Sequence, residues 1–174
     1  MKKSFFILLI VLMVMPFSIC VMAQSGSSIN TNTGVHILKS LEIAKTSDMH
    51  FGTMSIPTAP VDVVLTISNT RSASSPADID LLAQAPFSKN AAYTIAGSPN
   101  ATYSIILPPN GMVMLHSGGN NMNVNSFSCS YPGLTGVLSA AGTDQFNVGA
   151  TLELKDAQPY GIYEGTFDVT IAYN

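Results

Sequence analysis

Hydrophobic and polar residues alternate at every second position along most of this chain. A period of two indicates β-strands with one buried face. The three clearest strands predicted in this way are 61–67, 146–154 and 163–173. Weaker strands are predicted at 35–43, 49–54, 79–83, 93–96, 103–107, 111–116 and 122–131. No apolar stripe of helical period extends over ten residues beyond the amino-terminal segment.

Breaks in the alternation indicate how these strands are connected. Within 122–131 the apolar positions shift from even (Met122, Val124) to odd (Phe127, Cys129), as a β-bulge requires. Turns rich in Gly, Pro and Asn follow several strands and favour hairpins. The expected fold is an all-β, antiparallel β-sandwich formed by one domain, residues 35–174. Two polar segments, 24–34 and 70–77, are expected to be a flexible leader and a loop.

The amino terminus has the features of a signal peptide, residues 1–23. Two lysines precede an apolar run, 5–14, that is too short for a membrane span. Val21 and Ala23 suit a cleavage site, which leaves a mature chain of 151 residues. Lipidation of Cys20 is the open alternative, although Phe17 and Ile19 fit a lipobox poorly. The protein is therefore expected to be exported, to the periplasm, the cell surface or the medium.

Loss of the signal peptide makes the protein more acidic and leaves one cysteine. The mature chain has five basic and ten acidic residues, a net charge of −5, which disfavours nucleic acid and anionic membranes as partners. Cys129 has no partner for an intramolecular disulfide. Because it alternates with Phe127 and Tyr131, we expect it to be a buried, unreactive side chain.

Two sets of side chains are candidate metal ligands. Met112, Met114 and His116, with Met122 on the next strand, have the soft donors that Cu(I) prefers, but core methionines are the favoured interpretation. Asp78 and Asp80 share a strand face, but no third carboxylate or glycine loop completes a calcium site. Hence no metal or cofactor is expected.

The sequence holds no local motif of a catalytic site. Three scattered histidines lie outside any G-x-S-x-G, H-E-x-x-H or paired-carboxylate pattern. A general base needs an orienting partner and a site that shifts its pKa. No catalytic residue is therefore assigned, and the protein is not expected to be an enzyme.

The carboxyl-terminal segment, G-I-Y-E-G-T-F-D-V-T-I-A-Y-N, has a more specific pattern. Gly161 is fourteenth from the end of the sequence, apolar residues alternate after it, and Tyr173 is penultimate. This resembles the last strand of fimbrial subunits of the chaperone/usher class. The resemblance implies that an assembly chaperone, and then the next subunit, adds a strand beside it. The partner-binding residues it implies are Gly161, Tyr163, Phe167, Val169, Ile171 and Tyr173.

A second resemblance covers nearly the whole mature chain. The motifs M-H-F-G at 49–52, Y-S-I-I-L-P at 103–108 and F-N-V-G-A-T-L at 146–152, with the carboxyl-terminal segment, are similar to those of an uncharacterised secreted bacterial family. That family is called domain of unknown function forty-four-oh-two. It implies an exported, immunoglobulin-like β-domain and indicates no activity.

Two features differ from the fimbrial pattern. Many fimbrial subunits have a cysteine pair, whereas the mature chain has the single Cys129. Many also have an amino-terminal extension of alternating apolar residues, whereas Ile29 is the only apolar residue of 24–34. Val35, Ile37 and Leu41 are alternative donor residues, or they belong to an ordinary first strand. A complete sandwich would also end in an amphipathic strand.

Two functions remain open on the sequence alone. The first is an exported structural or adhesive protein, similar to a pilus subunit, that binds a chaperone, another subunit or a copy of itself through a strand edge. The alternative is a stand-alone extracellular domain that binds a glycan or host surface with the loops 117–121 and 70–77.

Overall fold

The structure is a computed structural model that describes residues 26–174. The expected signal peptide and Cys20 lie outside the described residues. Two units are distinguished, one ending at His36 and a compact one comprising Ile37–Asn174. Residues 26–36 are exposed and form no strand. Residues 26–174 contain no helix that is long and apolar enough to span a membrane.

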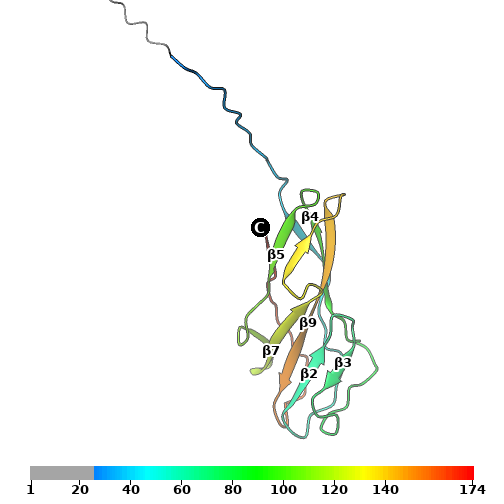
Figure 1. The fold of residues 1–174 in the computed structure, drawn as a ribbon. Helices are drawn as coiled ribbons and strands as arrows, with labels where there is room; N and C mark the ends of the chain where they lie inside the picture. Colours follow the sequence, from blue (N-terminus) through cyan, green and yellow to red (C-terminus); the bar gives the residue numbers. More distant parts are fainter. Residues whose placement is uncertain (1–25) are drawn as a thin grey trace, which may run out of the picture. The chain divides into compact units, whose positions relative to one another are not determined.

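The compact unit is built from ten strands (Figure 1). They are β1 (Glu42–Ser47), β2 (Val61–Leu65), β3 (Arg71–Ala73), β4 (Ala91–Ala96), β5 (Thr102–Ile106), β6 (Val113–Ser117), β7 (Asn120–Cys129), β8 (Thr135–Val137), β9 (Thr143–Leu154) and β10 (Thr170–Tyr173). All pairings between them are antiparallel, and no helix occurs among residues 26–174. The expected antiparallel, immunoglobulin-like β-sandwich is confirmed.

The long strand β9 organises the seven-stranded sheet. Val148 pairs with β4 and also with β7, and Thr151 pairs with β2 and also with β7. Therefore β7 occupies one edge of β9, while β4 and β2 follow one another along the other edge. β1 pairs with β4, β3 with β2, and β6 with β7. β1 is thus the outermost strand on its side of the sheet.

The second sheet has three strands in the order β10-β5-β8. β10 pairs with β5, so the carboxyl terminus lies beside β5 (Figure 1). Before β10 the chain meets the other sheet at one bridge, between Glu164 and His116 of β6. The carboxyl-terminal segment, residues 161–174, therefore forms backbone pairs with one strand of each sheet.

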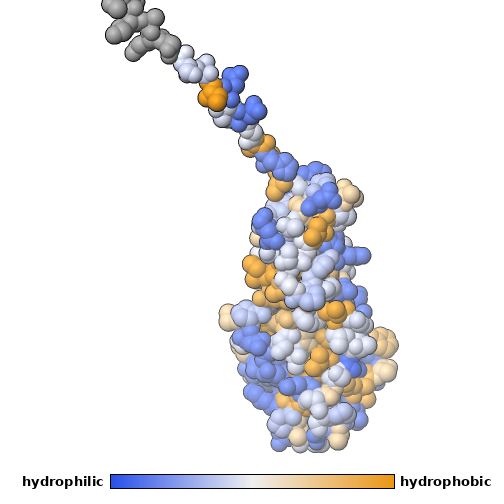
Figure 2. All heavy atoms as spheres, viewed as in Figure 1, coloured by the Kyte–Doolittle hydropathy of each residue, from blue (hydrophilic) through white to orange (hydrophobic). Residues whose placement is uncertain are grey.

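The interior contains two clusters of buried side chains. The first cluster contains the inward residues of β2, β6 and β7, the second half of β9, and Phe51 and Ile79. The second lies between β4 and the first half of β9 on one side and β5 on the other, and includes Phe146 stacked on Tyr93 with ring centroids 5.2 Å apart. Phe127 and Phe167 pack against both clusters and thus join them. On the face seen in Figure 2, the surface is a mixture of polar residues and small apolar patches.

Most predicted strands are present, but 49–54 and 79–83 contain only isolated bridges, and within 163–173 only β10 is a regular strand. The bulge predicted in 122–131 is confirmed, since the register of β7 shifts between Asn125 and Ser128. The prediction of a strand over 35–43 is wrong for its first part, because β1 begins at Glu42. The loop predicted at 70–77 contains β3, and β8 was not predicted.

A cluster of two tyrosines and a carboxylate connects the two sheets. Tyr103 of β5 donates a hydrogen bond of 2.8 Å to Asp144 of β9, and Tyr131 donates to both carboxylate oxygens at 2.7 and 2.9 Å. Burial, followed by the hydrogen bond to Asp144, raises the pKa of Tyr131 to about 12 and that of Tyr103 further. Both hydroxyls are thus held in the protonated form.

These shifts predict a loss of stability in alkali. A tyrosine whose pKa is higher in the folded state stabilises the protein fully below the unfolded value, about 10, and progressively less as the pH rises through the folded value. The free energy of unfolding should therefore fall between about pH 10 and pH 12. Urea unfolding of the wild type and of Tyr131→Phe measures this. A fall of the same size in the variant would contradict a role for Tyr131.

Candidate functional site

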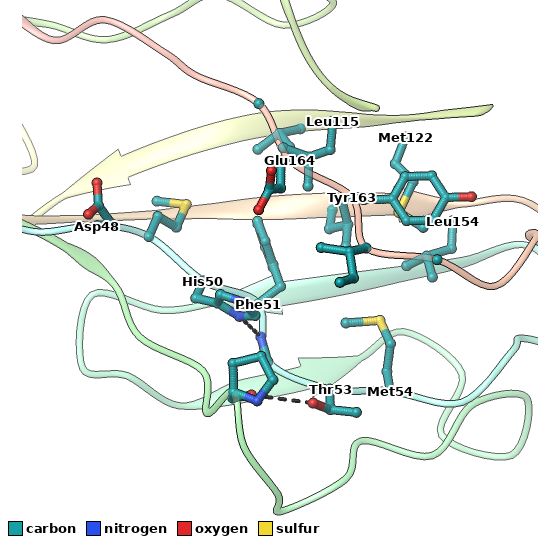
Figure 3. Close-up of a pocket in the computed structure, with 18 of the residues that line it drawn as sticks. Asp48, His50, Phe51, Thr53, Met54, Leu115, Met122, Leu154, Tyr163 and Glu164 are labelled. Carbon is teal, nitrogen blue, oxygen red and sulfur yellow. Dashed lines mark hydrogen bonds between the residues drawn. The ribbon is translucent and has the colours of Figure 1, made fainter. Parts of the chain in front are cut away.

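A groove lies between two segments of the compact unit (Figure 3). One wall is formed by the end of β1 and residues 48–57, and the other by residues 158–168. Its volume is about 1270 Å³. This exceeds the range of about 300–1,000 Å³ that is typical of small-molecule sites. The groove therefore suits an extended occupant better than a compact one.

The floor of the groove is apolar and belongs to the first core cluster. It consists of side chains of β6, β7 and β9, among them Leu115, Met122 and Leu154 (Figure 3). The walls add apolar groups that are exposed to water, since Tyr160 is 91% and Ile162 80% exposed. Covering this surface would remove apolar area from water, which favours binding.

The first wall has backbone groups that point into the groove. In an antiparallel ladder, the N–H and C=O of successive residues point to opposite edges. Met54 bridges Leu81, and the bonds of that bridge come from its neighbours: Ser55 N donates to Asp80 O, and Leu82 N donates to Thr53 O. The N–H and C=O of Met54 therefore face the opposite way, toward the groove.

The second wall has the same property. Glu164 exchanges two hydrogen bonds with His116 of β6, at 2.8 and 3.1 Å. Its neighbours Tyr163 and Gly165 therefore direct their backbone groups to the other edge. Among the described residues, no backbone hydrogen bond is made by Met54, Tyr163 or Gly165. Two unpaired strand edges thus line one apolar groove.

Contacts near each end fix the separation of the walls. Ala157 N donates to Pro57 O at 3.2 Å, next to the far end of the groove. Beyond the other end, the hydroxyl of Tyr173 donates to Lys39 O at 2.9 Å and accepts from Ser98 N at 2.8 Å. Between these two contacts the walls remain apart.

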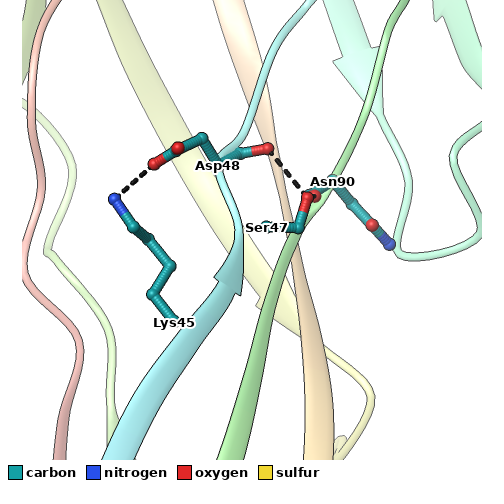
Figure 4. Close-up of polar contacts among 4 residues, drawn as sticks. All are labelled: Lys45, Ser47, Asp48 and Asn90. Atoms are coloured by element: carbon teal, nitrogen blue, oxygen red, sulfur yellow. Dashed lines mark hydrogen bonds and ion pairs between the residues drawn. The ribbon is translucent and has the colours of Figure 1, made fainter.

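Polar contacts define where β1 stops and the irregular wall begins (Figure 4). The register of β1 against β4 shifts between Lys45 and Ser47. Ser47 Oγ donates to Asn90 O at 3.1 Å, and Lys45 pairs with Asp48 at the rim of the groove. Both charged side chains are largely exposed, so the pair adds little stability.

The partner-binding residues expected from the fimbrial resemblance fall into three groups. Gly161, Tyr163 and Phe167 line the groove. Val169 and Ile171 are half-buried against the second core cluster, outside the groove lining. Tyr173 anchors the carboxyl-terminal segment to Lys39 and Ser98 within the chain.

The opposite wall, residues 48–57, was not among the expected site residues. The sequence motif at 49–52 lies within it, but nothing in that motif indicates that this segment faces the carboxyl-terminal segment. Only the fold brings the two walls together.

The structure corrects the interpretation of the methionines. Met112 and Met114 are exposed, as is His116, because the inward residues of β6 are Val113 and Leu115. Met122 pairs with Leu115 and is buried. Met122 therefore lies on the face opposite to Met114 and His116, so they cannot share a copper ion. Core packing, the favoured interpretation, holds only for Met122.

The other candidates have structural explanations. Cys129 is buried, as expected, and burial raises the pKa of its thiol. The carboxylate of Asp78 accepts hydrogen bonds from Thr58 and Ser75. Among residues 26–174 there is no cluster of three or more His, Cys, Asp or Glu side chains that suits a metal ion.

Gly165 allows the second wall to approach β6 closely. A Cβ atom at this position would lie 2.5 Å from Met114 O. Gly165→Ala should therefore push the segment away from β6 and lower the free energy of unfolding by about 1–3 kcal/mol. Denaturant unfolding measures the change. Gly133→Ala is the matched control, because a Cβ there meets nothing within 4 Å. Equal stability of the two variants would contradict close packing.

The fold and the groove define an immunoglobulin-like β-sandwich with an open, strand-sized groove between two unpaired edges. The chain belongs to the family described as Domain of unknown function (DUF4402), whose model matches residues 41–173. Comparison with curated proteins and with solved structures gave no match.

Proposed function

We propose that this protein is an exported structural or adhesive protein, similar to a pilus subunit, that assembles by accepting a β-strand from a protein partner into its groove. The single observation that carries the proposal is the pair of unpaired edges, at Met54 and at Tyr163 and Gly165, facing each other across an apolar floor. An inserted strand would pair with one or both walls and cover the floor with alternate side chains.

The unpaired backbone favours a strand over other occupants. A lipid or another apolar small molecule would cover the floor but leave the backbone groups of Met54, Tyr163 and Gly165 without partners. Buried backbone groups without hydrogen bonds cost free energy, whereas a strand supplies both donors and acceptors. Open edges are also surfaces that folded proteins normally protect, so their presence together supports a role in association.

A synthetic peptide tests the proposal. The probe has valine at every second position of an eleven-residue strand, threonine or asparagine between, and lysine at each end. It should bind residues 24–174, as fluorescence anisotropy measures. The control peptide has proline at two central positions, which removes backbone donors, and should not bind. Equal binding of both peptides, or of neither, would contradict strand pairing in the groove.

Matched variants locate the binding site. Leu115→Asp places a charge on the groove lining and should weaken binding of the valine peptide at least about tenfold. Val64→Asp makes the same change on β2 at a side chain outside the groove lining, and its affinity should equal that of the wild type. An equal loss in both variants would place the peptide elsewhere.

A further inference from the structure

Two isolated bridges anchor the first wall of the groove to the segment on its far side. One bridge joins His50 to Lys89, and the other joins Met54 to Leu81. Between them the wall has three residues, whereas the facing segment has seven. The facing segment must therefore bend away from the wall, and the ladder is interrupted there.

The guanidinium group of Arg71, at the start of β3, occupies this interruption. Its Nη1 atom donates hydrogen bonds to Phe51 O at 2.7 Å and to Thr53 O at 2.8 Å. Its Nη2 atom donates to Leu82 O on the facing segment. One side chain therefore connects the wall to the segment opposite and replaces part of the missing ladder.

Backbone carbonyls take the place of a carboxylate beside this cation. Among residues 26–174 Arg71 forms no ion pair, and its three hydrogen bonds go to backbone carbonyls. Burial lowers the pKa of Arg71, as expected for a partly desolvated cation. A guanidinium presents its donors in a rigid, planar fork, so the three carbonyls that it binds are held at fixed positions relative to one another.

The backbone of the wall is adapted to the guanidinium group. Gly52 has a φ of +82°, and a Cβ atom at this position would lie 2.6 Å from Arg71 Nη1. Glycine leaves that space free and adopts this conformation without strain. The N–H of Gly52 donates to His50 Nδ1 at 2.7 Å within the same wall (Figure 3). The conformation of the wall and the position of the guanidinium are therefore matched.

These contacts affect the groove, although Arg71 does not line it. Phe51 lines the groove and belongs to the first core cluster, and Met54 directs unpaired backbone groups toward it (Figure 3). Thr53, which the guanidinium holds, is the residue next to Met54. A wall that is ordered before binding loses little conformational freedom when a strand pairs with it, and this favours affinity.

We propose that Arg71 is the positioning residue of the acceptor groove and holds the first wall in the conformation to which a strand binds. This inference rests on the proposed function, because it concerns the same groove. Arg71 acts through Phe51 and Thr53 without touching the bound strand. Its hydrogen bond is the one that Phe51 O makes among residues 26–174. Without the guanidinium, the wall must shift until water reaches this carbonyl.

The experiment compares Arg71→Ala with Val148→Ala in residues 24–174. Val148 is buried in the second core cluster and lies outside the groove lining, so its truncation lowers the free energy of unfolding without touching the wall. Fluorescence anisotropy measures the affinity for the alternating valine peptide, at a temperature at which thermal unfolding shows both variants to be folded. Arg71→Ala should bind at least about tenfold more weakly than the wild type, and Val148→Ala as tightly as the wild type.

Two further measurements separate a loss of position from a loss of charge or of stability. Arg71→Lys keeps the charge but lacks the planar fork, so its affinity should lie between those of the wild type and Arg71→Ala. Amide exchange without the peptide reports on the wall itself. The N–H of Leu82, which donates to Thr53 O, should exchange at least about tenfold faster in Arg71→Ala and at the wild-type rate in Val148→Ala, because its exchange needs only local opening.

Wild-type affinity in Arg71→Ala would overturn the inference. Equal losses in Arg71→Ala and Val148→Ala would overturn it too, since the effect would then be one of general stability. If Arg71→Ala does not fold, Arg71→Lys decides, and wild-type affinity in that variant overturns the inference. In all these cases binding of the peptide by the wild type leaves the proposed function standing. If the wild type does not bind the peptide, the proposed function falls and this inference with it.

Discussion

Deletion of residues 161–174 is expected to unfold the protein. This segment covers both core clusters: Tyr163 packs against the first, Val169 and Ile171 against the second, and Phe167 against both. Within residues 26–174 it also supplies the only strand that pairs with β5 on one side, β10. Loss of this packing and pairing should cost about 5 kcal/mol or more, which is comparable with the whole stability of a domain of this size.

Circular dichroism and urea unfolding measure the result, and a deletion of 24–36 is the control of similar length. Residues 26–36 are exposed, so the control deletion should leave the free energy of unfolding within about 0.5 kcal/mol of the wild type. Addition of a peptide of residues 161–174 should restore the fold of the first deletion. A carboxyl-terminal deletion as stable as the control would contradict the packing described for this segment.

Phe146→Ala is expected to be the most destabilising single substitution in the second core cluster. Phe146 is 2% exposed and stacks on Tyr93 in the middle of the sandwich. Truncation of a buried phenylalanine leaves a cavity and typically costs about 3–5 kcal/mol. Denaturant unfolding at neutral pH gives the value.

Phe87→Ala is the matched control for this prediction. Phe87 is 67% exposed, so the same truncation should change the free energy of unfolding by less than about 0.5 kcal/mol. Similar losses in the two variants would mean that Phe146 is not at the centre of the cluster.

The sequence predicts a strand well where one face is apolar and the other polar. β2 and β9 have this pattern and occur where it places them. β6 does not, because Met112, Val113, Met114 and Leu115 are all apolar and either face is a plausible interior. The pairing of β6 with β7 places Val113 and Leu115 over the core, and this pairing decides which face of β6 is buried.

The carboxyl-terminal segment shows a second limit. Its alternation predicts one continuous strand, but regular pairing is confined to β10, and residues 161–169 form backbone hydrogen bonds with β6 only at the Glu164–His116 bridge. Here the chain passes from β6 of one sheet to β5 of the other. A period of two shows which side chains face inward, but it does not show which strand the segment pairs with. The alternation nevertheless predicts the inner face of the segment correctly. The half-buried side chains are those of its alternating apolar residues, Tyr163, Phe167, Val169, Ile171 and Tyr173.

The groove could be predicted only in part. The resemblance of the final strand to fimbrial subunits indicates one wall. The other wall is about a hundred residues away in sequence, and an edge that is not paired leaves no pattern of its own in the chain.

Amide hydrogen exchange tests the central claim most directly, because it reports on the unpaired edges themselves. The N–H groups of Met54, Tyr163 and Gly165 should exchange rapidly in the isolated monomer, and addition of the alternating valine peptide should slow at least one wall at least about tenfold. The N–H of Glu164, already bonded to His116, should be protected in both states. Protection of Met54, Tyr163 and Gly165 before the peptide is added, or no change after it binds, would contradict an open acceptor groove.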